Sequence, residues 1–184
     1  MINKPYEARR FKIDQDFLPV GTAPGNGPDL IFEFEDFVIA VEATLTENSR
    51  QEAVEGEPVR RHVADLAEHY ENTLHKPVYG LFIANRIDSN TAETFRIGIW
   101  YNRTDEKMRL TIIPLTLAQF KAVFAALFKF SHVDVGQIRE LLELCGDLRT
   151  LHEAPAWKQK IAETIQLRLQ QLETANGRVR NDND

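Results

Sequence analysis

The chain is poor in cysteine and has no long apolar run. Its single cysteine, Cys145, among 184 residues excludes an intramolecular disulfide framework and a cysteine-rich zinc site. The longest apolar runs, such as residues 123–128, are far shorter than the ~20 residues that span a bilayer. The first residues lack the apolar segment of a signal peptide. We therefore expect a cytoplasmic protein without a membrane partner.

The sequence also lacks an excess of positive charge. It has 22 Lys and Arg residues against 28 Asp and Glu residues, for a formal net charge of −6. Proteins that hold nucleic acid by themselves are usually basic, because phosphate groups dominate that binding. The acidic balance therefore argues against autonomous recognition of bare DNA. It does not exclude chemistry on DNA that a partner holds in place.

The composition present is that of a folded globular chain. Hydrophobic residues make up 43% and charged residues 27%, which is typical of soluble domains. The length suits one domain of ordinary size, and we find no internal repeat or linker. We expect a single domain over residues 1–176 and a disordered polar tail over residues 177–184.

Apolar periodicity predicts an α/β fold. Two apolar runs flank the polar pair Glu35-Asp36 and predict a β-hairpin over roughly 29–35 and 37–45. The second run is nearly continuous, as in the central strand of a sheet. Further expected elements are a short helix at 6–11, helices at 46–54, from Pro58 and at 90–96, and strands at 78–84, 97–101 and 109–114. Three helical stripes follow the potential cap Thr116. The pattern favours a mixed sheet flanked by helices, with a helical C-terminal layer.

Two acids at the predicted hairpin carry the first chemical signal. Asp29 opens the first strand and Glu42 lies near the end of the second, so an antiparallel pairing brings them to one edge of the sheet. Converging carboxylates repel each other unless a cation lies between them, and carboxylate oxygens are ligands that Mg²⁺ prefers. Such a metal would favour phosphodiester hydrolysis. Taken alone, the same pattern fits solvated surface acids equally well.

The segment that follows Glu42 carries a more specific signal. Pro28-Asp29 is followed after about a dozen residues by Glu42-Ala43-Thr44-Leu45, then by Glu55 and by Arg60-Arg61-His62. Over roughly residues 28–130 the chain resembles type IIS restriction endonucleases of the AlwI kind, with their nicking relatives. These enzymes belong to the PD-(D/E)xK superfamily, and their cleavage domains resemble that of FokI.

The resemblance implies a role for each residue of this segment. Its catalytic residues would be Asp29, Glu42, Glu55 and His62, its metal ligands Asp29, Glu42 and Glu55, and its phosphate contacts Arg60 and Arg61. We hypothesise that Glu55 binds a metal or orients the attacking water and that His62 assists as a base or a phosphate contact. The alternatives are a hydrogen-bonded core histidine and solvated or ion-paired arginines.

Two features of this segment complicate the assignment of these roles. Thr44 stands where the superfamily has lysine, two residues after the second acid, and threonine cannot supply a positive charge. Which residue takes over that role stays open. Glu55 and His62 are about two helical turns apart and would share one face of a continuous helix. Gly56 and Pro58 predict an interruption between them.

The resemblance also implies an assembly. Relatives of this kind join a DNA-recognition region to the cleavage domain, whereas one α/β core uses most of this chain. We therefore expect a small cleavage subunit that depends on Mg²⁺, with Mn²⁺ able to substitute, and no small-molecule cofactor. It would cut one strand of double-stranded DNA together with a large recognition and nicking subunit.

Two other functions stay open at this point. The chain would also fit a stand-alone homodimeric nuclease of the same superfamily with broad specificity. It would equally fit a non-catalytic interaction module that retains the nuclease fold, for which the missing lysine is the best argument.

Overall fold

A mixed five-stranded sheet forms the centre of the computed structural model, which describes residues 6–7, 27–46, 50–129 and 135–181. The strands follow the order β1-β2-β3-β4-β7. Their bounds are β1 (Tyr6–Glu7), β2 (Leu30–Glu33), β3 (Val38–Thr44), β4 (Val78–Ala84) and β7 (Thr111–Thr116). A separate two-stranded hairpin consists of β5 (Ile99–Tyr101) and β6 (Lys107–Arg109). The predicted mixed sheet is confirmed.

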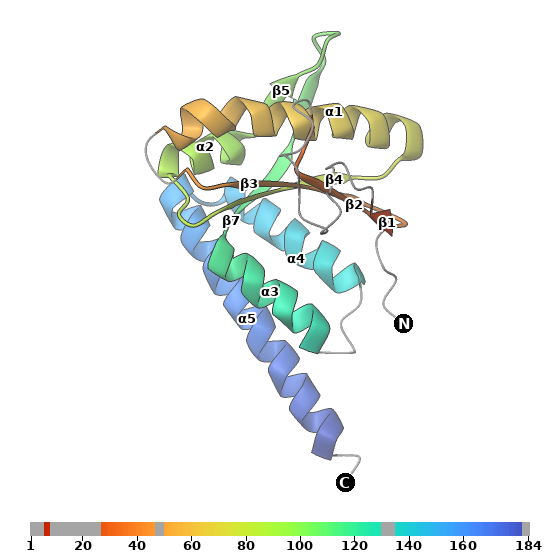
Figure 1. Cartoon of the computed structure of the whole chain (residues 1–184), viewed down its shortest axis with the longest axis vertical. Coiled ribbons are helices and arrows are strands. Elements are labelled where there is room, and N and C mark those ends of the chain that lie inside the picture. The colour runs from red at the N-terminus through yellow and green to blue at the C-terminus, as the bar shows by residue number, and fades with distance from the viewer. Residues whose placement is uncertain (1–5, 8–26, 47–49, 130–134, 182–184) are drawn as a thin grey trace, which may run out of the picture.

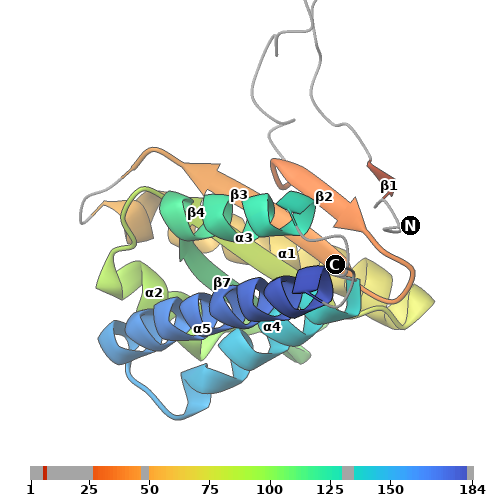
Figure 2. The same cartoon turned by 90° about the horizontal axis from the view of Figure 1, so that it is seen from below.

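Helices cover both faces of the sheet. The π-helical segment η1 (Glu52–Gly56) leads into α1 (Glu57–Leu74), and α2 (Ser89–Ile97) follows β4. The C-terminal layer contains α3 (Leu117–Lys129), α4 (Val135–Asp147), the short 3-10 segment η2 (Leu148–Thr150) and α5 (Ala154–Asn181). Figure 1 shows α1 on one side of the sheet and α3, α4 and α5 on the other. Figure 2 shows the three C-terminal helices packed side by side across that face.

The pairing of β3 with its two neighbours fixes the geometry of the hairpin. β2 runs antiparallel to β3, with Leu30 opposite Val41, and β4 runs parallel to β3. Residues 38–41 are all buried, as expected for a central strand. Because β2 is antiparallel, the residues that precede it lie at the carboxyl end of β3. Crevices outside the carboxyl ends of parallel strands are common binding sites in open α/β sheets.

Helix α1 packs on the sheet through a buried apolar stripe that includes Val59 and Val63. Gly80 on β4 permits a close approach, since a Cβ atom there would lie 2.8 Å from Cγ2 of Val63. The helix ends at His75, whose φ of 54° is in the left-handed region. This close packing fixes α1 against the two central strands.

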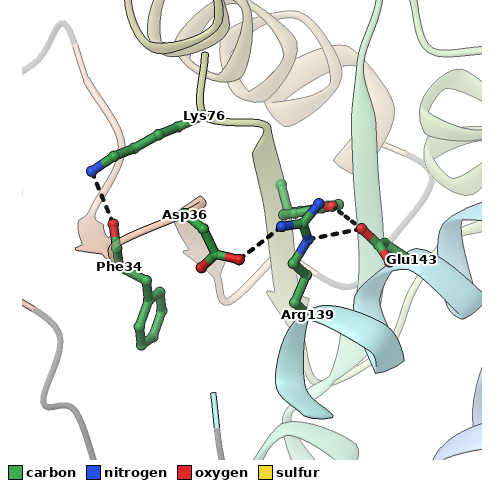
Figure 3. Close-up of polar contacts among 6 residues, drawn as sticks. Phe34, Asp36, Lys76, Arg139 and Glu143 are labelled. Carbon is green, nitrogen blue, oxygen red and sulfur yellow. Dashed lines mark hydrogen bonds and ion pairs between the residues drawn. The ribbon is translucent and has the colours of Figure 1, made fainter. Parts of the chain in front are cut away.

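The turn of the β2–β3 hairpin is held on both sides (Figure 3). Arg139 on α4 donates hydrogen bonds to Asp36 at 2.8 Å and to Glu143 at 2.9 Å. Lys76 donates to the backbone oxygen of Phe34 at 3.0 Å. These contacts hold the turn of the hairpin, which is the end away from Asp29. They therefore support the pairing of β2 with β3 without using any residue of the site.

Several sequence predictions differ from the observed elements. Residues 6–7, expected in a short helix, form strand β1, and residues 8–11 lie outside the described ranges. The single strand expected over 109–114 is divided between β6, which pairs with β5, and β7, which pairs with β4. Helix α5 runs through residue 181, into the segment expected as a polar tail. Within the described ranges, no helix is long and apolar enough to cross a membrane.

The capping role expected for Thr116 is confirmed. Its hydroxyl accepts a hydrogen bond from the backbone N–H of Gln119 at 3.2 Å, and the Gln119 side chain accepts one from the Thr116 backbone N–H at 2.7 Å. This reciprocal pair is a capping box, which satisfies two backbone donors at the start of α3.

Candidate active site

The hairpin brings Asp29 to the carboxyl end of β3. Its Oδ2 accepts a hydrogen bond from the backbone N–H of Ala43 at 2.8 Å. This contact fixes the Asp29 carboxylate beside the residue that follows Glu42. The two acids therefore lie at one edge of the sheet.

Glu42 contacts a histidine from α1. Its Oε1 lies 2.5 Å from Nδ1 of His62, and the two side chains are only 13% and 10% exposed. Burial, reinforced by the negative charges of Asp29 and Glu55, raises the pKa of Glu42 to about 8. Burial, followed by the nearby Arg61 cation, lowers the pKa of His62. Both shifts favour the neutral form of the group concerned.

The other ring nitrogen of His62 has no internal partner. Nε2 is buried and makes no hydrogen bond within the described part of the chain. Buried polar atoms are nearly always hydrogen-bonded, so such an atom calls for a specific explanation. His62 is thus neither a solvated side chain nor a fully satisfied core histidine.

Thr44 holds the third acid. Its hydroxyl donates a hydrogen bond of 2.6 Å to Oε1 of Glu55, and it accepts one from the backbone N–H of Thr46 at 3.1 Å. Two residues after Glu42, where the resemblance led us to expect a lysine, this chain therefore places a hydroxyl that orients a carboxylate. The acid comes from η1, on the far side of the loop that follows β3.

The interruption predicted between Glu55 and His62 is wrong. The backbone passes from η1 into α1 without a break, and Gly56 and Glu57 both have right-handed helical dihedral angles. Pro58 lies in the first turn of α1, directly after the π-helical turn. The backbone before Pro58 forms this wider π-helical turn, and π-helical turns often occur at functional sites. His62 consequently contacts Glu42, and Glu55 is close enough to raise the Glu42 pKa.

Gln51 is a structural component of the site that the sequence did not indicate. Its side chain is fully buried. Nε2 donates to the backbone oxygens of Thr46 at 2.5 Å and Arg86 at 2.9 Å, and Oε1 accepts from the N–H of Asp88 at 2.9 Å. It joins the loops after β3 and β4 at the start of η1. A glutamine in a polar segment is typical of a solvated surface, so no sequence signal pointed to this role.

The two predicted phosphate contacts lie beside the site in different environments. Arg60 donates to the backbone oxygen of Gly56 at 3.0 Å, and its guanidinium lies 5.6 Å from the ring centre of Trp100. Arg61 forms a partly exposed ion pair with Glu57 at 3.2 Å. Arg61 is close enough to Glu42 and His62 to influence the pKa of each.

The chemistry of the three acids suits a hard cation. Asp29, Glu42 and Glu55 come from three different elements, and each accepts or shares one hydrogen bond with a neighbour. Within the described ranges, however, no group of three or more His, Cys, Asp or Glu side chains has the geometry of an assembled metal site. The donor types therefore fit Mg²⁺, and the acids would have to move closer together to share an ion.

Comparison with known proteins assigns the class. The family model described as AlwI restriction endonuclease matches residues 1–123. Because the match covers well over half of the chain, the chain belongs to the AlwI restriction endonuclease family, which is a family of nucleases.

A solved structure gives a more particular relative. The chain is similar to the small subunit, R.BspD6I2, of the heterodimeric restriction endonuclease R.BspD6I, with 26% sequence identity and a TM-score of 0.68. The similarity covers 90% of this chain and 81% of that subunit. No curated protein sequence matches the chain.

Proposed function

We propose that this chain is the cleavage subunit of a heterodimeric type IIS restriction endonuclease. With a large recognition and nicking subunit it cuts one strand of double-stranded DNA in a Mg²⁺-dependent reaction. The observation that carries this proposal is the convergence of Asp29, Glu42 and Glu55 at the carboxyl end of β3. The arrangement is consistent with the PD-(D/E)xK superfamily.

The three acids would hold the metal ion. Bound there, Mg²⁺ would act as a Lewis acid on the scissile phosphate and stabilise the leaving oxygen. The chain's own part is to keep three carboxyl groups together. Glu42 retains its proton at neutral pH when no cation offsets its neighbours, since its pKa is raised to about 8.

Thr44 and His62 would act through the acids that they contact. Thr44 fixes one oxygen of Glu55 and leaves the other for a metal ion or a water molecule. His62 fixes Glu42 through Nδ1, which makes it a positioning residue in this arrangement. The roles of His62 as a base and of Arg60 and Arg61 as phosphate contacts stay predictions.

The partner subunit would supply the DNA-binding capacity that this acidic chain has little of. The related subunit belongs to a heterodimeric enzyme, and the net charge of −6 disfavours strong binding of DNA by this chain alone. The large subunit would therefore hold the DNA while this chain cuts it.

A supercoiled-plasmid assay with Mg²⁺ tests the proposal. It compares this protein, its nicking subunit and the mixture of both, with Asp29→Asn as the site variant and Asp147→Asn on α4 as the matched control. We expect linear product only in the mixture, at least 100-fold slower with Asp29→Asn and unchanged with Asp147→Asn, because metal ligands and transition-state contacts contribute on the order of 10² or more in rate.

Other outcomes favour the alternatives. Cutting of unrelated plasmids by this protein alone would indicate an autonomous homodimeric nuclease. No linear product with an active nicking subunit, together with an unchanged melting temperature on adding Mg²⁺, would indicate a non-catalytic module. Thermal melting with Mg²⁺ also reports metal binding independently of activity, because a ligand of the folded state stabilises it. The shift should be lost in Asp29→Asn.

A further inference from the structure

A groove lies between α1 and the β5–β6 hairpin, beside the candidate active site. Its volume is about 420 Å³, within the usual range for small-molecule sites. Trp100 and Met108 lie opposite each other in the hairpin register, and both line the groove. Asp65 and Glu68 line it from α1. The other lining residues are Arg61, Ala64, Tyr101, Asn102 and Arg103. In Figure 1 the hairpin rises past the middle of α1.

The lining combines three kinds of chemical group. Trp100 and Met108 provide apolar contact, and an indole ring is a stacking surface for a nucleobase. Asp65 and Glu68 provide carboxylate oxygens, which accept hydrogen bonds from base amino groups such as N4 of cytosine. Arg61 and Arg103 can bind phosphate oxygens.

This mixture discriminates between classes of ligand. A simple anion would be repelled by Asp65 and Glu68, and a purely apolar ligand would leave both carboxylates desolvated without a partner. A nucleotide offers all three complementary groups: a flat aromatic face, amino donors on the base edge and a phosphate.

The groove is also in the correct place for the strand that is cut. Asp65 is one helical turn beyond His62 on α1, close enough for its charge to act on the His62 ring. One turn is about 5 Å along the helix axis, whereas a DNA strand advances about 3.4 Å per nucleotide along its own axis. One helical turn is therefore on the scale of one or two nucleotides of a strand whose scissile phosphate lies beside His62.

We propose that this groove binds one unpaired nucleotide of the strand being cut, next to the scissile phosphate. The base stacks on Trp100 with its pairing edge toward Asp65 and Glu68, and Arg103 contacts a flanking phosphate. The base must be unpaired, because a base inside a duplex has both faces stacked and its pairing edge occupied. The inference rests on the proposed nuclease function and adds the position of a substrate nucleotide.

Tryptophan fluorescence tests the groove without any cleavage. The chain has 2 tryptophans, and Trp157 is fully buried in the core, so Trp100 is the one within reach of a ligand. The full-length protein is titrated with single-stranded oligo(dC) of eight nucleotides at low salt in EDTA. We expect quenching in the unchanged chain and no response from the remaining tryptophan in Trp100→Phe.

Two matched pairs locate the contact. Arg103→Ala should weaken binding by about tenfold or more, as for the loss of a hydrogen bond to a charged group. Arg109→Ala changes the same charge on the same hairpin at a residue that does not line the groove, and should bind like the unchanged chain. Oligo(dC) should bind more tightly than oligo(dT), which lacks an amino group, and Asp65→Ala should abolish that preference.

Several results would overturn the proposal. The first is that millimolar oligonucleotide does not quench the Trp100 fluorescence. The second is that Arg103→Ala and Arg109→Ala weaken oligonucleotide binding equally. The third is that the large subunit quenches this fluorescence and the oligonucleotide does not, which would make the groove a protein contact. The plasmid assay tests the nuclease function separately. Cutting without quenching would refute the groove alone, and quenching without cutting would refute the nuclease function while retaining a nucleotide site.

Discussion

Gln51 provides the most quantitative prediction, because one buried side chain joins three backbone segments around the site. Replacement by alanine removes the hydrogen bonds to the backbone oxygens of Thr46 and Arg86 and from the N–H of Asp88. The 0% exposure of Gln51 prevents water from replacing the amide without a local opening. The variant should therefore be less stable and should position η1 less well.

The magnitude follows from the three groups that lose their partner. The Asp88 N–H becomes unsatisfied, at a cost of about 1–3 kcal/mol, and each carbonyl loses a bond with a net contribution of about 0.5–1.5 kcal/mol. Arg86 is an exposed residue, so water can reach its carbonyl and reduce that part of the loss. A decrease of about 2–4 kcal/mol is expected, a large share of the 5–15 kcal/mol of a typical domain.

Urea unfolding followed by circular dichroism measures this change. The matched control is Gln159→Ala on α5, where the amide makes one exposed hydrogen bond to Glu163 at 2.9 Å and its loss should cost less than about 0.5 kcal/mol. At a temperature where both variants are folded, Gln51→Ala should also cut DNA more slowly in the complete enzyme. Equal stability of the two variants would refute the conclusion that the Gln51 side chain holds the three backbone segments together.

Three further changes test other contacts. Gly80→Ala places a methyl group 2.8 Å from the Val63 side chain and should cost about 1–3 kcal/mol; an unchanged melting temperature would contradict this close packing. Trp157→Phe removes a buried 2.8 Å donor to a backbone carbonyl and should lower the free energy of unfolding by about 1–3 kcal/mol, and a smaller loss in urea would show that the carbonyl finds another partner. The hydrogen bond from Lys76 lowers the pKa of Glu33 below 4.5, so this contact stabilises the fold above that pH and the contribution is lost as pH falls through the lower folded value. Glu33→Gln should therefore lower the free energy of unfolding at neutral pH and make its decrease in acid less steep. An equally steep decrease in both chains would contradict a stabilising contact between Glu33 and Lys76.

The sequence predicted the hairpin and the position of its acids because the forces involved are local. Alternating apolar residues and a short polar turn determine which strands pair, and an antiparallel pairing with a short turn has few possible registers. Asp29 therefore had to lie near the residue after Glu42, where the structure has it hydrogen-bonded to Ala43.

The continuity of η1 and α1 was not predictable in the same way. Gly56 and Pro58 are poor residues for a helix interior, and propensity alone predicts a break there. The observed backbone continues through a π-helical turn before Pro58, and buried residues on α1 pack against the sheet. Tertiary packing outweighs an intrinsic preference of this size.

By itself, the sequence determined which residues we propose for the chemistry and on which local elements they lie. Only the tertiary structure decided the partner of each side chain: His62 for Glu42, a threonine hydroxyl for Glu55, and two loop carbonyls for Gln51. These contacts join segments that a parallel crossover brings together, and the periodicity of one element does not specify its placement against another. The same reason explains why the groove beside Trp100 has no signature in the sequence.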